Sequence, residues 1–150
     1  MTKSLPLEIF YIYFSPYTAH AIELEGVIYP TVEHAYQCQR YVDNKIIEEI
    51  RVARSPIKAW QISTKYKHLQ IPEFKEAEHK LKVMKMLMKL KAEQHEEVMK
   101  ALKDTSDLQI IKRIVTYPPS DGFWDIGEDG KGQNHIGKIW MELRDEFLKK

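Results

Sequence analysis

Four polar side chains recur at helical spacing in the stretch YPTVEHAYQCQRY: Glu33, Tyr36, Gln37 and Arg40. At about 100° per residue, they fall on one narrow face of a helix. Glu33 would lie in the first turn, where the helix dipole and the free N–H groups favour an ionised carboxylate. Such a carboxylate can stabilise a developing positive charge. The alternative interpretation is a surface ladder of Glu, Gln and Arg neighbours, in which each pair contributes about 0.2–0.5 kcal/mol.

Lys80 is a second candidate, because it shares a helical stripe with Val83, Leu87 and Leu90. An ammonium group on an apolar stripe either extends to the edge of the helix or is desolvated. A desolvated lysine loses its proton more readily, and its amine can then attack the aldehyde carbon of a sugar. The spacing alone leaves both interpretations open.

A third set of candidates lies in the glycine-rich segment TYPPSDGFWDIGEDGKGQ, at residues 116–133. Asp121 and Asp125 bracket Trp124, and glycines follow at positions 127, 130 and 132. These glycines would let backbone amides approach a phosphate closely, ahead of a helix that begins near Asn134. The alternative is that Trp124 fills the core and that the glycines only form turns. The spacing of a Walker or dinucleotide-binding loop is absent.

The composition restricts the class of protein. A chain of 150 residues, with 43% hydrophobic and 30% charged residues, is typical of one globular domain with its own core. Lys and Arg number 23 against 22 Asp and Glu, so the formal charge is only +1. This balance disfavours a protein that binds nucleic acid through its overall charge.

Cysteine usage and the apolar runs indicate the compartment. Cys38 is the only cysteine, so neither an internal disulfide nor a Cys–Cys metal motif can form. His34 and Cys38 stand four residues apart, but no further ligands lie nearby, so we expect both to be packed and assign no metal. No secretory signal and no run of about 18 apolar residues is present, which favours the cytoplasm.

The local patterns predict mainly helices after a small N-terminal sheet. Residues 8–14 are β-branched and aromatic, and Glu25-Gly26 forms a turn between two further short strands. We therefore expect an α+β fold, a mainly helical single domain with a small N-terminal antiparallel sheet. Helices are predicted over 31–41 with Thr31 as N-cap, over 45–54, from Ser55-Pro56, from Pro72 to about 102 as one bent helix or two, over 107–115 after Thr105 or Ser106, and from Asn134.

Three stretches, EGVIYPTVEHAYQCQRY, ARSPIKAW and SDGFWDIGEDGKGQNHIGKIWMELRDEF, follow one another over nearly the whole chain, and KLKVMKMLMKLK adds a Lys-x-x-Val-Met segment. Together they resemble the landmarks of the NADAR family, also called YbiA-like proteins. The resemblance implies a compact, predominantly helical α+β fold and N-glycosidase chemistry, the cleavage of a bond between ribose C1 and a nitrogen. Family members are linked to phosphoribosylamino-pyrimidine intermediates of riboflavin synthesis or to the removal of ADP-ribose from guanine.

The resemblance implies catalytic roles for Glu33, Lys80 and Asp121. Lys80 would attack C1 and form a Schiff base, or hold a phosphate. The implied partner is a small phosphoribosyl or ADP-ribosyl compound, with nucleic acid only as an ADP-ribosylated substrate and without a membrane. No cofactor or metal is implied, and the oligomeric state stays open. The residues implied to bind the substrate are Ser15, Tyr17, Tyr36, Gln37, Arg40, Trp124, Gly132 and Asn134.

The implied chemistry is consistent with these residue types. Breaking a C1–N bond places positive charge on the ribose ring, which an ionised Glu33 would stabilise, or whose attacking water it would orient. The departing base needs a proton, and the carboxyl group of Asp121 is the expected donor. Trp124 or Tyr36 would stack on the leaving base.

Three positions depart from the family pattern. Pro16-Tyr17 follows Ser15 where the family commonly has Asn-Phe, which removes an amide that would contact the substrate. Glu76 replaces a tryptophan that often stands four residues before the lysine, and Asp125 replaces the usual glycine after Trp124. We expect these changes to affect the choice of substrate rather than the chemistry.

Two other classes of protein compete with an enzyme. One is a non-catalytic module that binds a nucleotide sugar or an RNA end through Arg40, the lysines of residues 75–103 and the glycine loop. The other is a helical interaction protein that uses the methionines at 84, 86, 88 and 99 as a partner groove, although methionines at helical spacing usually belong to a core.

Overall fold

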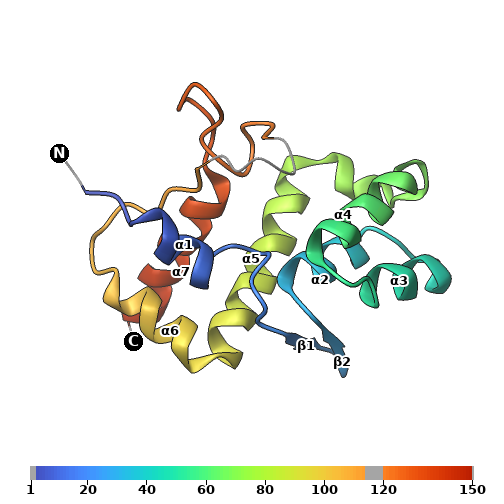
Figure 1. The fold of residues 1–150 in the computed structure, drawn as a ribbon, viewed down its shortest axis with the longest axis horizontal. Coiled ribbons are helices and arrows are strands. Elements are labelled where there is room, and N and C mark those ends of the chain that lie inside the picture. The colour runs from blue at the N-terminus through green and yellow to red at the C-terminus, as the bar shows by residue number, and fades with distance from the viewer. Residues whose placement is uncertain (1–2, 114–119, 150) are drawn as a thin grey trace. The chain divides into compact units, whose positions relative to one another are not determined.

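The computed structural model describes residues 3–113 and 120–149. Within these residues, seven α-helices and one antiparallel strand pair confirm the predicted α+β class, mainly helical with a small N-terminal sheet (Figure 1). The chain groups into two compact units. The terminal unit holds the described residues up to Ser15 and from His95 onward, and the central unit holds residues 16–94. The single domain expected from the composition stays a prediction.

The terminal unit is built from α1 (Leu7–Tyr13), α6 (Glu96–Asp104) and α7 (His135–Leu148). Phe14 packs against Trp140, with 5.0 Å between ring centroids, and the Trp140 indole N–H donates to the Phe14 carbonyl over 2.8 Å. The strand predicted over 8–14 is wrong, because this segment forms α1. Its β-branched and aromatic preferences are overridden, since the helical spacing buries Phe10 and Phe14 together.

The central unit follows the order β1, β2, α2, α3, α4, η1, η2 and α5. In it α2, α3 and α4 pack against one another, and α2 also packs on the longer α5 (Figure 1). The bounds are β1 Ile22–Leu24, β2 Val27–Tyr29, α2 Val32–Cys38, α3 Asn44–Arg51, α4 Pro56–Lys65, the 3₁₀ helices η1 Lys67–Leu69 and η2 Pro72–Lys75, and α5 Ala77–Gln94.

The predicted hairpin turn at Glu25-Gly26 is confirmed. Both residues have positive φ, 52° and 82°, as a two-residue turn of the primed type requires. The turn pairs Glu23 with Ile28 in antiparallel register. At the end of α5, the Gln94 amide accepts from the Glu23 N–H over 2.8 Å and donates to the Glu23 carbonyl over 2.9 Å, which anchors β1.

The predicted helix starts at Thr31 and Ser55 are confirmed. The Thr31 hydroxyl accepts from the His34 backbone N–H over 3.1 Å, and the Ser55 hydroxyl accepts from the Lys58 N–H over 3.0 Å. Each hydroxyl satisfies one of the N–H groups that have no partner within their own helix.

The long periodic stretch after Pro72 forms two helices, α5 and α6. They are separated at His95, whose backbone is extended at φ −127°. Met84 and Met88 are buried in the core, as expected for methionines at helical spacing.

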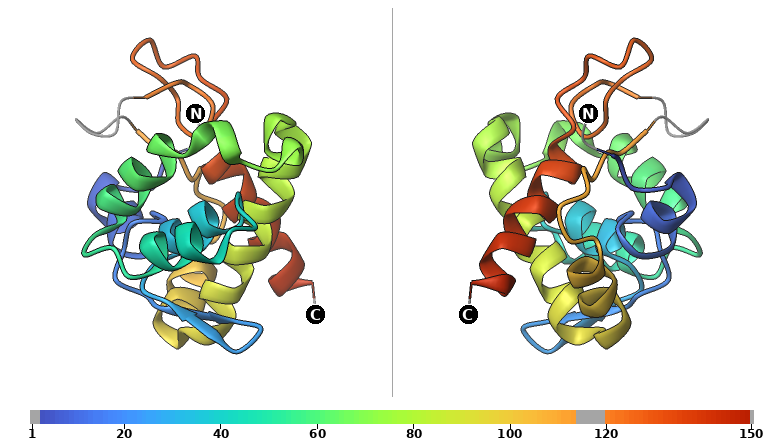
Figure 2. Two further views of the ribbon diagram at one scale, coloured as in Figure 1. Left: turned by 90° about the vertical axis from the view of Figure 1, so that its right-hand side faces the viewer. Right: turned by 90° about the vertical axis from the view of Figure 1, so that its left-hand side faces the viewer.

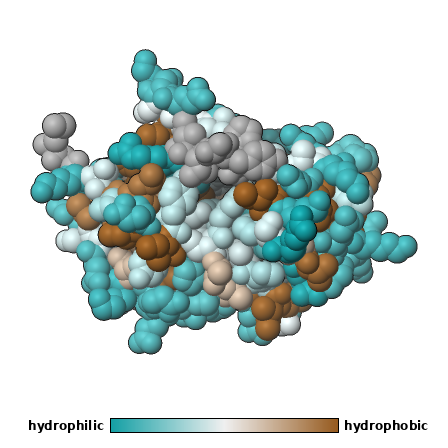
Figure 3. All heavy atoms as spheres, in the orientation of Figure 1, coloured by the Kyte–Doolittle hydropathy of each residue, from teal (hydrophilic) through white to brown (hydrophobic). Residues whose placement is uncertain are grey.

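On the face shown in Figure 3, hydrophobic residues occur in separate small groups among hydrophilic ones. No helix among the described residues combines the length and apolar character needed to cross a membrane.

The helix predicted over 107–115 is wrong in its described part, residues 107–113, and its last two residues lie outside the described ranges. Ser106 has a positive φ of 53°, which stops the preceding helix. Beyond it, Gln109 pairs with the N-terminal segment: its N–H donates to Lys3 over 2.9 Å and its carbonyl accepts from Leu5 over 2.8 Å. These non-local bonds replace the helical ones.

Candidate active site

Helix α2 is buried along its whole length, and two hydrogen bonds of His34 help to hold it in place. All seven of its side chains belong to the buried class. His34 Nε2 lies 2.9 Å from the Ala53 carbonyl, so Nε2 carries the hydrogen and Nδ1 accepts from the Thr31 hydroxyl at 2.8 Å. Burial lowers the pKa of His34 and raises that of the Cys38 thiol to about 12. His34 and Cys38 are therefore packed, as predicted.

Glu33 and Gln37 form a buried pair on α2. Their exposed fractions are 5% and 4%, and the Gln37 amide donates to Glu33 Oε2 over 2.7 Å. The surface-ladder interpretation is therefore wrong for these two residues. Burial strengthens any interaction between the Glu33 carboxylate and a nearby positive charge, because little water screens it.

Pro16, the first residue of the central unit, contacts α2 through its backbone. The Pro16 carbonyl accepts from the Glu33 N–H over 3.0 Å. Tyr17 follows in the central unit and is half-buried, whereas Ser15 is buried in the terminal unit, where its N–H donates to Phe10 over 3.1 Å. This bond fixes the backbone at Pro16, the residue before Tyr17, beside Glu33.

Arg40 lies just beyond α2 in a group of neutral and aromatic side chains. Its guanidinium donates to Gln70 Oε1 over 2.8 Å and to the Tyr36 hydroxyl over 3.2 Å. The guanidinium carbon lies 5.0 Å from the ring centroids of both Tyr36 and Phe74. The Tyr36 ring is fully buried in this group, so its predicted stacking on a leaving base is not supported.

Lys80 is half-buried in the first turn of α5, whereas Lys91, near the end of the same helix, is only 1% exposed. Lys91 Nζ donates to the Thr18 hydroxyl over 2.6 Å, and that hydroxyl lies 2.6 Å from His20 Nδ1. Burial lowers the pKa of Lys91 to about 7. Lys91 is not among the residues predicted from the sequence, although it follows Met88, Leu87 and Met84 by three, four and seven residues, the spacing of a buried helical stripe.

The buried Lys91 predicts a pH-dependent stability. Between pH 7 and about 10.5 the unfolded chain binds a proton at Lys91 that the folded chain does not. The free energy of unfolding therefore increases as pH rises through this range. We expect Lys91→Met to be stabilised relative to the parent by a few kcal/mol at pH 6. The difference should shrink by about 1.4 kcal/mol per pH unit above 7.

Urea unfolding of the parent and of Lys91→Met at pH 6, 7.5 and 9 measures this change. Lys82→Met is the control, because it removes an exposed lysine from the same helix. A difference between parent and Lys91→Met that does not vary with pH would contradict the prediction.

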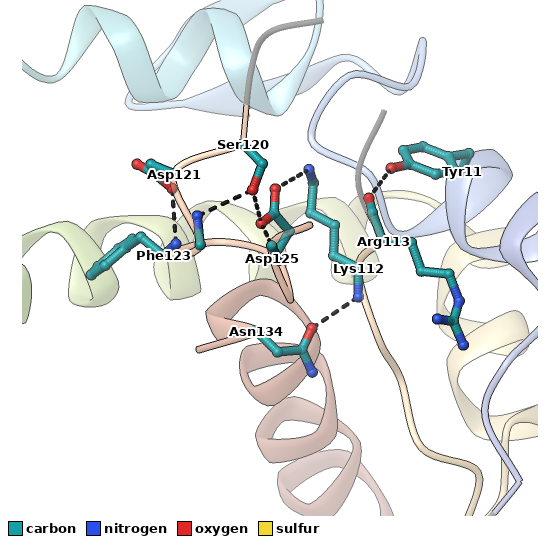
Figure 4. A network of polar contacts seen from close by, with 10 residues as sticks. Tyr11, Lys112, Arg113, Ser120, Asp121, Phe123, Asp125 and Asn134 are labelled. Atoms are coloured by element: carbon teal, nitrogen blue, oxygen red, sulfur yellow. Dashed lines mark hydrogen bonds and ion pairs between the residues drawn. The ribbon is translucent and has the colours of Figure 1, made fainter. Parts of the chain in front are cut away.

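The loop before α7 is organised by Asp125 rather than by Asp121 (Figure 4). Asp125 is buried and accepts from the Ser120 hydroxyl and, over 2.9 Å, from the Gly127 N–H. The Lys112 ammonium lies 3.8 Å from its second oxygen. Asp125 therefore connects Ser120 and Gly127 of the loop to the segment that carries Lys112.

Burial, and secondly the charge of Asp125, raise the pKa of the Tyr11 phenol to about 12. The Tyr11 hydroxyl donates to the Arg113 carbonyl over 2.8 Å (Figure 4). Tyr11 is therefore held as a neutral donor at physiological pH. Its bond connects α1 to the segment that carries Lys112 and Arg113.

Asp121 is exposed, and its carboxylate accepts from the Phe123 N–H over 2.8 Å. Trp124 is half-buried, with its ring centroid 4.8 Å from that of Phe123. The interpretation of Trp124 as a core residue is therefore wrong, and this ring stays a candidate for stacking on the leaving base.

Among the described residues, the glycine amides of the predicted phosphate cradle donate within the loop. Gly132 donates to the Ile126 carbonyl over 2.6 Å and Gly130 to the Gly127 carbonyl over 3.3 Å. The first amides of α7 are also used, His135 by Phe123 and Ile136 by Trp124. In both views of Figure 2, the loop extends beyond the N-terminal end of α7.

Asn134 begins α7 but does not cap it through its side chain as predicted. Its φ is 53°, and its amide instead accepts from the Lys112 N–H over 2.8 Å and donates to the Ile110 carbonyl over 3.0 Å. Asn134 is thus a clamp between α7 and residues 110–112. A contact of Asn134 with the substrate stays a prediction.

The structure thus places the predicted site residues in two groups. Glu33, Tyr36, Gln37 and Arg40 lie together on and beside α2, in the unit that also holds Tyr17 and Lys80. Asp121, Trp124, Gly132 and Asn134 lie in the loop before α7, in the unit that also holds Ser15. Among the described residues, no three His, Cys, Asp or Glu side chains are grouped so that they could hold a metal ion.

The comparisons identify the family. The model of the NADAR domain matches residues 7–148. N-glycosidase YbiA of Escherichia coli strain K12 is 34% identical over 135 residues, which cover 89% of this chain and 80% of that protein. The riboflavin biosynthesis protein PYRR of Zea mays is 30% identical over 149 residues, which cover 90% of this chain and 23% of that protein.

A solved structure of a relative has the same fold. The NMR structure of Escherichia coli YbiA superposes with a TM-score of 0.78 at 31% identity, covering 90% of this chain and 77% of that chain. The reaction class expected from the resemblance, N-glycosidase, is the class stated in the names of several relatives. The chain therefore belongs to the NADAR domain family.

Proposed function

We propose that the chain is an N-glycosidase that hydrolyses the C1–N ribosidic bond of a phosphoribosyl or ADP-ribosyl compound. Within the family just identified, the observation that carries the proposal is the buried pair of Glu33 and Gln37. The Glu33 carboxylate is 5% exposed and accepts a bond from the Gln37 amide over 2.7 Å. A carboxylate held in one orientation away from water suits a reaction that develops positive charge.

In the proposed reaction, the C1–N bond breaks and water supplies the hydroxyl group to C1. Glu33 stabilises the positively charged ribose ring, or orients the attacking water. The departing nitrogen takes up a proton, for which Asp121 is the proposed donor. Asp121 is exposed, and the Phe123 N–H donates to its carboxylate over 2.8 Å.

Lys80 offers a covalent variant of the same reaction. Its amine would displace the base from C1 and form a Schiff base with the opened sugar, which water then hydrolyses. The position of Lys80 in the first turn of α5, half-buried in the unit that holds Glu33, is compatible with either route.

We propose a cytoplasmic setting, because the single cysteine, Cys38, is buried and free.

Incubation with two substrates tests this function. We expect the protein to release the base from 5-amino-6-ribosylaminouracil phosphate or from a guanine oligonucleotide that carries ADP-ribose, as followed by mass spectrometry. Release from one of them selects the substrate branch. If both substrates are recovered intact and the protein binds them with an affinity that falls as the salt concentration rises, the result would instead support a non-catalytic module that binds a nucleotide sugar or an RNA end.

A further inference from the structure

We propose that the Arg40 guanidinium is the subsite for the phosphate on the ribose of the substrate. The inference rests on the proposed function, since it assigns the recognition of one part of that substrate. It predicts that the enzyme distinguishes a phosphorylated ribosyl compound from the same compound without its phosphate.

The charge of Arg40 has no counterion in the described part of the chain. Its two hydrogen-bond partners, Gln70 Oε1 and the Tyr36 hydroxyl, are both neutral. An arginine carries five N–H donors, and these two bonds leave donors available. Nε is buried without a hydrogen-bond partner, whereas the residue as a whole is half-buried. A positive group of this kind is available to bind an anion.

The guanidinium is held in one orientation before any ligand arrives. Two buried rings, Tyr36 and Phe74, lie 5.0 Å from its central carbon, and their own centroids are 5.8 Å apart. The Arg40 backbone is fixed as well, since its carbonyl accepts from the Ile71 N–H over 2.8 Å. A planar, preoriented guanidinium matches the geometry of a phosphate and loses little entropy on binding.

The spacing from Glu33 suits a single ribosyl phosphate. Glu33 lies in the first turn of α2, and Arg40 lies two residues beyond Cys38, the last residue of that helix. About 8 Å of helix therefore separates Glu33 from the end of α2 that precedes Arg40. With Glu33 at C1, a phosphate on the far side of the ribose would point along α2 toward Arg40.

The alternative phosphate site in the glycine loop is disfavoured by its bonding. The amides of Gly127, Gly130 and Gly132 all donate within the loop, as do those of His135 and Ile136 at the start of α7. A phosphate there would have to displace these bonds. Arg40 meets a phosphate without that loss.

Two variants of Arg40 test the subsite. Arg40→Met removes the charge and the donors, whereas Arg40→Lys keeps the charge but loses the planar fork. We expect Arg40→Met to weaken the binding of ribose 5-phosphate, measured by calorimetry, by roughly 30-fold or more, with a partial loss in Arg40→Lys. Binding of unphosphorylated ribose should not change. Arg54→Met, which removes an exposed arginine of the same unit, is the matched control.

The kinetic readout uses the cleaved substrate with and without its phosphate. Arg40→Met should lower kcat/KM for the phosphorylated compound by a similar factor, mainly through KM, and leave the dephosphorylated compound unaffected. An equal loss for both compounds, or unchanged binding of ribose 5-phosphate, would overturn the subsite. If no compound is cleaved but the binding result holds, the proposed reaction fails and the subsite stands.

Discussion

Glu33→Gln should reduce kcat by about 10³-fold and leave the fold intact. The substitution replaces a carboxylate oxygen by an amide of nearly the same shape, so the buried contact with Gln37 can be kept. The negative charge is lost, and with it the stabilisation of the ribose ring in the transition state. Loss of one preorganised electrostatic contact typically costs a factor of about 10²–10³, and loss of a group that also orients water adds to that.

Turnover of the substrate found to be cleaved, followed by mass spectrometry, measures this effect. Glu93→Gln is the matched control, because it makes the same change at an exposed position of α5 and should retain parental activity. Thermal unfolding of Glu33→Gln should show a midpoint no lower than that of the parent, since removing a buried charge does not by itself destabilise the folded state. Parental kcat in Glu33→Gln would show that Glu33 is not the charge-stabilising group.

Gly137→Ala should destabilise the protein by about 3 kcal/mol or more, although alanine is the better helix former. Gly137 lies in the first turn of α7, where the chain at Ile110 and the Asn134 amide approach closely. A Cβ at position 137 would overlap the Ile110 carbonyl oxygen and lie 2.5 Å from Asn134 Nδ2. The backbone would have to shift and the Asn134 clamp would break, which exceeds the gain of about 1 kcal/mol from helix propensity.

Urea unfolding monitored by circular dichroism measures the change, and the midpoint of thermal unfolding should fall by roughly 10 °C. Lys138→Ala, at the next and exposed position of α7, should change stability by no more than about 0.5 kcal/mol. If Gly137→Ala were as stable as the parent, helix propensity would outweigh the close approach of Ile110, contrary to this prediction.

The helix starts and the hairpin were predictable because they depend on neighbouring residues. Thr31 and Ser55 cap helices through bonds to residues only three positions away, and Glu25-Gly26 forms its turn within a single hairpin. The buried face of α2 was predictable only as a set of residues. That Glu33 and Gln37 are buried depends on α3, α4 and α5, which pack around α2 from distant parts of the chain.

The errors share one cause, the partners that a segment finds far along the chain. Residues 8–14 have strand preferences but form a helix, because Phe14 meets Trp140. Residues 107–113 have a helical pattern but stay irregular, because Gln109 pairs with Lys3 and Leu5. Local preferences contribute only a few tenths of a kcal/mol per residue, so burial of a large aromatic ring or several non-local hydrogen bonds can reverse them.

The sequence by itself determined the family, the mainly helical class, the caps and the residue types available for cleaving a ribosidic bond. Only the tertiary structure decided which charges are removed from water. It buried Lys91 rather than Lys80 and gave Asp125 instead of Asp121 the central place in the loop. Among the residues that the structure describes, it left Arg40 without a counterion. Desolvation depends on every element that surrounds a group, and spacing along one helix or loop does not contain that information.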